Sequence, residues 1–287
     1  MVAVLLACVS AVLFGGMTVA LRIGLREAPD AQLATLSTVL PALAVALTAA
    51  VVEATRPAPL GVPQAWPFLL AGLIAPGGSQ ILFTLAVRAA GPSRTSVAVG
   101  TAPLVAVAIA ILVLGEPLRA PLFIGAVLIV AGGIALVAER GRPEHVRAVG
   151  LAYAFLATIL FASRDNLVRH LAKVTAAARP GVAAAATLLT GTIVAAGWVA
   201  ASRPRIRFAD AVRFVPAGLC FGLSYVCLFE AYYRGRVTVV SPLVATESLW
   251  GVVLSALVLR RTELVGRRLA LGAALVVAGG ALIGAFR

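Results

Sequence analysis

The sequence has little charge and almost no lysine. Only 12% of its 287 residues are charged, whereas a soluble domain has about 25%. Of the 24 basic residues, Lys173 alone is a lysine. The three cysteines, Cys8, Cys220 and Cys227, lie inside apolar runs without metal or redox spacing, so no disulfide scaffold is predicted. Because the chain also has no glycine-rich phosphate loop, nucleophile motif or paired-carboxylate cleft, we do not expect it to be an ATP-driven pump by itself.

What the sequence has instead is long apolar runs. Apolar residues make up 61% of the chain, and 27 glycines add to them. A membrane helix needs about 20 mostly apolar residues, so the composition is sufficient for about ten crossings with short connections. The runs predict ten helices at 2–22, 31–52, 67–87, 95–115, 119–138, 148–169, 181–201, 212–233, 237–259 and 267–286. We therefore expect an all-α membrane protein.

The net charge of +13 comes from arginines, most of which stand in the breaks between these runs. In that position they flank membrane spans and meet anionic lipid headgroups. No zinc spacing or aromatic-basic motif of a nucleic-acid module accompanies them. The expected surroundings are a lipid bilayer, with no nucleic-acid partner.

An internal repeat organises the chain. IGAVLIVAGG at 124–133 returns 147 residues later as LGAALVVAGG at 271–280. FLLAGL at 68–73 matches FVPAGL at 214–219, with a spacing of 146. Two further positions share the first spacing, since Phe14 and Arg22 fall on Phe161 and Arg169.

The repeat predicts two halves, 1–143 and 144–287, each with five spans. An odd number of crossings makes the second half enter the membrane from the opposite side. The prediction is thus two inverted five-helix repeats. This is the geometry of an alternating-access carrier, whose two open states are near mirror images.

Two segments carry a resemblance to a known family. They are TAPLVAVAIAILVLGEPLRAPLFIGAVLIVAGG at 101–133 and TESLWGVVLSALVLRRTELVGRRLALGAALVVAGG at 246–280. The sequence resembles the EamA-type branch of the drug/metabolite transporter superfamily over nearly its whole length. Ser248 replaces the usual proline after Glu, and Arg260 with Arg261 replaces the usual Gly-Glu. The resemblance implies a ten-helix inner-membrane carrier that moves metabolites, amino acids or drugs, often outward.

Ionisable groups inside spans are functional candidates because they cost about 2.5 to 3.5 kcal/mol on insertion scales. Arg164 and Asp165 interrupt the sixth span. Asp165 could form a self-neutralising pair with Arg169 at the i, i+4 spacing. In the other interpretation, Arg164 and Asp165 face a central cavity and bind a zwitterionic or charged solute.

Two glutamates add to the candidate site. Glu230 lies near the end of the eighth span, where it either snorkels to the interface or faces the cavity. Glu247 lies near the middle of the ninth span. In one interpretation it binds the solute or a coupling proton, and in the other it caps the free backbone of a distorted helix.

Polar and aromatic neighbours would complete the pocket. Tyr225 precedes Glu230 by five positions, and Trp250 follows Glu247 by three. Ser79 and Gln80 follow Pro76, Gly77 and Gly78, a triplet that predicts a kink in the third span. The glycine pair Gly218 and Gly222 and the two AGG segments are expected to permit close helix packing.

Taken together, these features predict a secondary-active, exporter-like transporter with a central site near the membrane midplane. We expect a small-molecule substrate, protons as a candidate coupling ion, no cofactor or metal, no enzymatic activity, and a monomer or homodimer in a bacterial inner membrane. A lipid flippase shares the inverted repeat and remains an alternative, while an intramembrane enzyme fits less well. Orientation stays open, because the odd-numbered loops hold more arginines, whereas relatives place both termini in the cytoplasm.

Overall fold

The structure is a computed structural model of the chain. It describes residues 1–57, 59–102, 104–105, 120–137, 148–174, 178–204, 207–235, 240, 243–259 and 266–286. The regular elements in this part of the chain are all helices. Six of them are long and apolar enough to cross a membrane.

In the first half the elements follow the predicted runs closely. They are α1 (Val2–Glu27), α2 (Ala31–Ala54), η1 (Pro63–Ala65), α3 (Trp66–Gly72), η2 (Leu73–Gly78), α4 (Ser79–Ala90), α5 (Pro92–Val99) and α7 (Ala120–Val137). Asp30 starts α2 by accepting a hydrogen bond from the Leu33 amide at 2.8 Å, as expected of an N-cap residue. Gly91, with φ of 84°, and Pro92 at the first helical position separate α4 from α5.

The second half has a matching series of elements. They are α8 (Ala148–Val174), α9 (Pro180–Ser202), α10 (Phe208–Val212), α11 (Val215–Arg234), α13 (Glu247–Val258) and α14 (Arg267–Phe286). Arg164 and Asp165 do not interrupt α8, which runs through both residues. The rest of the predicted fourth span, from 106 to 115, lies outside the described residues.

The third span is kinked where the sequence predicts it. The α3, η2 and α4 segments follow one another, and Ala75 within η2 has a non-helical backbone with φ of −147° and ψ of 124°. Pro76 has no amide hydrogen, so it cannot continue the helical hydrogen bonds. The kink leaves the Ala75 carbonyl free to accept the Tyr225 hydroxyl at 3.0 Å.

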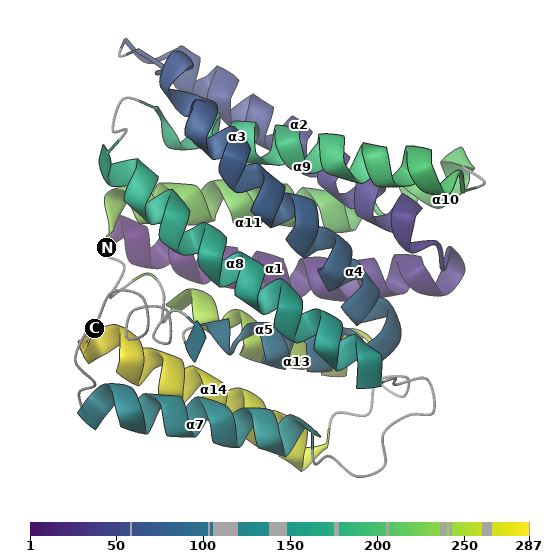
Figure 1. Cartoon of the computed structure of the whole chain (residues 1–287), viewed down its shortest axis with the longest axis vertical. Coiled ribbons are helices and arrows are strands. Elements are labelled where there is room, and N and C mark those ends of the chain that lie inside the picture. The colour runs from purple at the N-terminus through teal and green to yellow at the C-terminus, as the bar shows by residue number, and fades with distance from the viewer. Residues whose placement is uncertain are drawn as a thin grey trace.

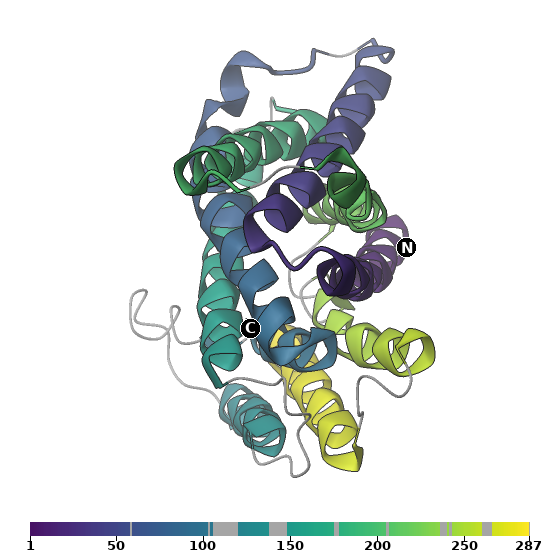
Figure 2. The same ribbon diagram turned by 90° about the vertical axis from the view of Figure 1, so that its right-hand side faces the viewer.

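Helices that occupy corresponding positions in the two halves make corresponding contacts. The α1 helix packs along α11, and α8, which corresponds to α1 in the repeat, packs along α4. Two further pairs join counterparts directly, α2 with α9 and α7 with α14, and α5 of the fourth span packs on α13 of the ninth. Figures 1 and 2 place α7 and α14 together at one end of the molecule, and Figure 1 shows α2 and α9 at the other.

Glycines allow the closest of these crossings. A Cβ atom on Gly132 of α7 would lie 2.7 Å from the Gly272 carbonyl oxygen of α14, and one on Gly279 would lie 2.5 Å from that of Gly125. Each contact becomes the other when 147 is added or subtracted, and the two contacts together show that α7 and α14 run antiparallel. Gly218 approaches the backbone of α2 in the same way. The close packing expected at the AGG and GxxxG glycines is therefore confirmed at these positions.

The fourth and ninth spans are both broken by a turn with the same hydrogen bonds. The chain turns at Thr101 after α5, where the amide and hydroxyl donate to the Ala98 carbonyl at 3.1 and 2.6 Å. At Thr246, before α13, the amide and hydroxyl donate to the Leu243 carbonyl at 3.1 and 2.6 Å. Each threonine hydroxyl thus gives a second hydrogen bond to a carbonyl that already accepts the threonine amide.

A further contact fastens the end of α2 to the start of α9. The Glu53 side chain is only 5% exposed, and its Oε1 accepts a hydrogen bond from the Gly181 amide at 2.9 Å. The Arg179 guanidinium donates to the Glu53 and Pro59 carbonyls. The N-terminus of α9 is thereby capped by a residue of another helix, and α2 and α9 run antiparallel.

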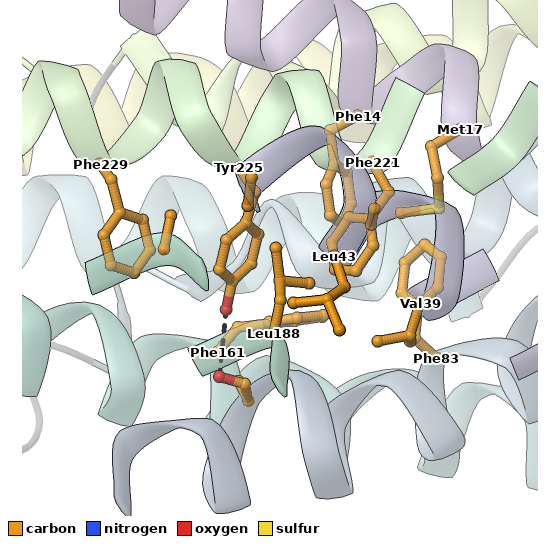
Figure 3. Close-up of a cluster of buried hydrophobic side chains, with 14 of the residues drawn as sticks. Phe14, Met17, Val39, Leu43, Phe83, Phe161, Leu188, Phe221, Tyr225 and Phe229 are labelled. Carbon is orange, nitrogen blue, oxygen red and sulfur yellow. Dashed lines mark hydrogen bonds between the residues drawn. The ribbon is translucent and has the colours of Figure 1, made fainter. Parts of the chain in front are cut away.

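Aromatic rings fill the centre of the bundle. Phe14 of α1, Phe83 of α4 and Phe161 of α8 form a triangle with ring centroids 5.3 to 6.0 Å apart. Phe221 and Tyr225 of α11 continue the cluster (Figure 3). Their edge-to-face arrangement is one that aromatic rings prefer. The packed rings form an apolar surface beside the polar residues.

Candidate functional site

The centre of the candidate site is an ion pair inside the bundle. Arg164 and Asp165 lie near the middle of α8, with Arg164 Nε 2.8 Å from Asp165 Oδ1. The Arg164 side chain is almost completely buried, whereas Asp165 is 24% exposed. The sequence allowed Asp165 to pair with Arg169, whose side chain lies outside the described residues. In the structure Asp165 pairs with its neighbour.

Tyr225 holds the arginine from the opposite side. The Arg164 Cζ atom lies 4.7 Å from the centroid of the Tyr225 ring and 5.9 Å from that of Phe161. The Tyr225 hydroxyl is fixed in turn by the Ala75 carbonyl (Figure 3). A cation over an aromatic face is attracted by the ring, more strongly when both are desolvated. Tyr225 therefore connects α11, α8 and the kink of η2, and it positions the guanidinium.

Glu247 brings a second carboxylate to this pair. It is partly buried and interacts electrostatically with both Asp165 and Arg164. It is the first residue of α13, directly after the turn at Thr246, where the helix dipole favours a negative charge. Thr246 makes no side-chain cap at this end of α13, and the Thr246 and Ser248 hydroxyls donate to the Leu243 and Ala245 carbonyls. Whether Glu247 binds a solute or proton or caps the backbone stays a prediction.

Ser79 and Gln80 are fully buried at the start of α4. The Ser79 hydroxyl and both amide atoms of Gln80 have no hydrogen-bond partner in the described part of the protein. Gly78, just before them, packs on Leu160, one helical turn before Arg164. No hydrogen bond or ion pair joins Gln80 to the charged residues. A buried amide without partners costs about 1 to 3 kcal/mol for each unsatisfied group, which makes Gln80 a ready hydrogen-bonding group.

Glu230 and Trp250 lie apart from this centre. Glu230 pairs with Arg234, one turn later on α11, at 2.5 Å, and it interacts with Glu53 of α2. Trp250 is 39% exposed, and its Cβ lies against the Gly15 position of α1. The group that the structure assembles therefore consists of Arg164, Asp165, Tyr225 and Glu247.

Two groups at this site were not predicted from the sequence. Phe161 stands three residues before Arg164 on the same helix face, so its spacing was a usable signal. The Ala75 carbonyl had an indirect signal only, the kink predicted from Pro76. The contact between this carbonyl and Tyr225 joins residues 150 positions apart, which no local pattern reveals.

The charged residues of the candidate site are distributed unequally between the two halves of the chain. Arg164, Asp165 and Glu247 all belong to the second half. At the positions 147 earlier than Arg164 and Asp165, the first half has the uncharged residues Met17 and Thr18. The first half contributes neutral polar groups such as the Ala75 carbonyl.

Comparison with known proteins agrees with this architecture. One crystal structure of a protein covers 98% of this chain and 95% of its own, with a TM-score of 0.68 and 21% sequence identity, so the two share a fold. No curated protein matches the chain. The model of the EamA-like transporter family matches residues 1–138 and again residues 148–285. Since these matches cover nearly the whole sequence, the chain is a multi-pass membrane protein that belongs to the EamA-like transporter family.

Proposed function

We propose that this protein is a secondary-active carrier that exports small metabolites, amino acids or drugs across a bacterial inner membrane by alternating access. The observation that carries the proposal is the group formed by Arg164 and Asp165 of α8, a helix apolar enough to cross a membrane, and Glu247 of the shorter apolar helix α13. Each charge is expensive there, by about 2.5 to 3.5 kcal/mol on insertion scales. Such residues are kept where a solute or ion passes.

The symmetry of the contacts supports the alternating-access mechanism. In our proposal the ten crossings are α1, α2, the α3–η2–α4 unit, the segment starting with α5, α7, α8, α9, α11, the segment ending with α13, and α14. Two counterpart pairs, α2 with α9 and α7 with α14, run antiparallel, and so do α5 of the fourth span and α13 of the ninth. Inverted repeats have this relation. Exchanging the conformations of the halves then produces a second state of similar energy.

The unsatisfied atoms of the site indicate the kind of solute. The buried Arg164 Nη1 atom has no hydrogen-bond partner among the residues that the structure describes, and a guanidinium prefers a carboxylate or phosphate. Glu247 is a carboxylate in excess of the Arg164–Asp165 pair. A zwitterion would satisfy both ends, with its carboxylate on Arg164 and its ammonium group toward Glu247 and Asp165.

Of the two glutamates considered for proton coupling, Glu247 is favoured. Glu230 is already neutralised by Arg234 at 2.5 Å, whereas among the described residues Glu247 interacts with an arginine that Asp165 shares. A carboxylate that binds either a proton or the solute's cation would couple the two flows. The flippase alternative is distinguished by the transported molecule, since it predicts movement of phospholipid and not of soluble zwitterions.

The test uses purified protein reconstituted into vesicles, after a thermal-shift screen of amino acids, sugars, nucleosides and cationic drugs identifies a stabilising solute. We expect Glu247→Gln to reduce transport and flatten its pH dependence, while the matched carboxylate variant Glu230→Gln retains both. Transport by Glu247→Gln that is unchanged in rate and pH dependence would remove Glu247 from coupling. Phospholipid scrambling without solute transport would replace the carrier by a flippase.

A further inference from the structure

The short helix α10 presents an apolar face that no other part of the described protein covers. Phe208 is 84% exposed and Val212 is 47% exposed. Their i, i+4 spacing places both on the same side of the helix. Because α10 connects α9 to α11 (Figure 1), this face lies at the end of two membrane-spanning helices.

The corresponding connection of the first half has a similar face. Val62 and Trp66 stand 146 residues before Phe208 and Val212, and they are 59% and 61% exposed. They also lie between two membrane segments, α2 and α3. Exposed apolar pairs at such connections fit the boundary between headgroups and acyl chains.

The two connections differ in charge. Residues 202–214 contain four arginines and one aspartate, a net charge of +3. The corresponding residues 56–68 contain Arg56 and no acidic residue, a net charge of +1. The basic excess is therefore a property of the α10 connection and is not required by the repeat.

Three of the four arginines beside α10 lie in the described part of the chain, and they divide into two groups. Arg213 forms ion pairs with Glu27 and Asp210, so its charge is neutralised within the protein. Arg203 and Arg207 are exposed, and neither has an ion pair or side-chain hydrogen bond in the portion that the structure describes. Arg203 ends α9 with a left-handed backbone, φ of 46°, a position that glycine usually occupies. Within the described residues no side-chain contact accounts for an exposed arginine in this position.

We propose that α10 docks on anionic phospholipid, with Phe208 and Val212 at the acyl boundary and Arg203 and Arg207 on the headgroup phosphates. Charge complementarity identifies the occupant, since guanidinium groups bind phosphate oxygens with two donors at once. The apolar face beside them fits a lipid better than a soluble anion, which would leave Phe208 in water. The η1 connection, with a similar apolar face and one arginine, does not share this preference.

The experiment measures which lipids remain on the intact protein. The full chain is placed in nanodiscs of equimolar phosphatidylglycerol and phosphatidylcholine, and native mass spectrometry gives the ratio of the two lipids that remain bound. Wild-type protein is expected to be enriched in phosphatidylglycerol, and the enrichment should fall as salt is added. Each interfacial arginine raises the affinity for anionic lipid about fivefold. The phosphatidylglycerol enrichment of the Arg203→Gln/Arg207→Gln variant should therefore be roughly 25-fold lower than that of the wild type.

Arg56→Gln is the matched control, because it removes an exposed arginine from the corresponding connection. It should lower the phosphatidylglycerol enrichment by no more than about fivefold, as expected of one interfacial arginine. All three substituted residues are exposed, so the variants are expected to fold. The proposal is overturned if wild-type protein shows no enrichment, if the double variant keeps it, or if Arg56→Gln reduces it as much as the double variant does.

Discussion

The contact between Glu53 and Gly181 can be tested by a double-mutant cycle. Glu53 is buried, and its carboxylate accepts a hydrogen bond from the first turn of α9 at 2.9 Å. A hydrogen bond to a charged group contributes about 1.5 to 3 kcal/mol. Glu53→Ala is therefore expected to destabilise the protein by about 2 kcal/mol, and Glu53→Gln by about half of that because the amide oxygen still accepts.

The second side of the cycle uses the space around the glycine. A Cβ atom on Gly181 would lie 2.8 to 3.0 Å from the Glu53 carboxylate, so Gly181→Ala must displace the carboxylate and weaken the same hydrogen bond. In the Glu53→Ala background the obstacle is absent. There Gly181→Ala should be neutral or stabilising, since alanine is favoured over glycine in a helix by about 0.8 to 1 kcal/mol.

The measurement is the free energy of reversible unfolding in mixed micelles for the wild type, both single variants and the double variant. We expect a coupling energy of about 1 to 3 kcal/mol. Asp30→Ala, which removes the local cap of α2, serves as a control and should add independently to either variant. Additive effects of Glu53→Ala and Gly181→Ala would refute the cross-helix cap.

Two other predictions concern the contacts of Tyr225 and the glycine contacts between α7 and α14. Tyr225→Phe removes the hydrogen bond to the Ala75 carbonyl and keeps the ring against the guanidinium, so it should lower the unfolding free energy by about 1 kcal/mol with little loss of solute affinity. Tyr225→Leu also removes the ring, and it should weaken solute binding in a thermal-shift titration. Gly132→Leu and Gly279→Leu should destabilise the protein to similar extents, because the two glycines make corresponding contacts; unequal melting temperatures would contradict this equivalence.

Hydropathy was sufficient to place most of the helices. The run at 31–52 became α2 at Ala31–Ala54, and the run at 181–201 became α9 at Pro180–Ser202. A helix in lipid satisfies its own backbone, so composition placed the limits of these two helices, although the turns at Thr101 and Thr246 lie inside apolar runs. The same reasoning explains why Pro76, which has no donor, marked the kink correctly.

The partners of the candidate residues were harder to predict. The i, i+4 rule suggested Arg169 for Asp165, a pairing that stays a prediction because the Arg169 side chain lies outside the described residues. Among the described residues Asp165 pairs with Arg164, whose guanidinium is held by Tyr225. That arrangement depends on where α11 lies relative to α8, and helix packing is not encoded in local spacing. Glu53 gave no signal for the same reason, because its partner is 128 residues away.

The placement of all three central charges on one half has a consequence for a carrier cycle of the proposed kind. In such a cycle the two halves exchange conformations, but the first-half positions that correspond to Arg164 and Asp165 hold Met17 and Thr18. The two end states therefore surround the cargo with different groups, and the mirror relation of the repeats does not extend to the charged residues of the site.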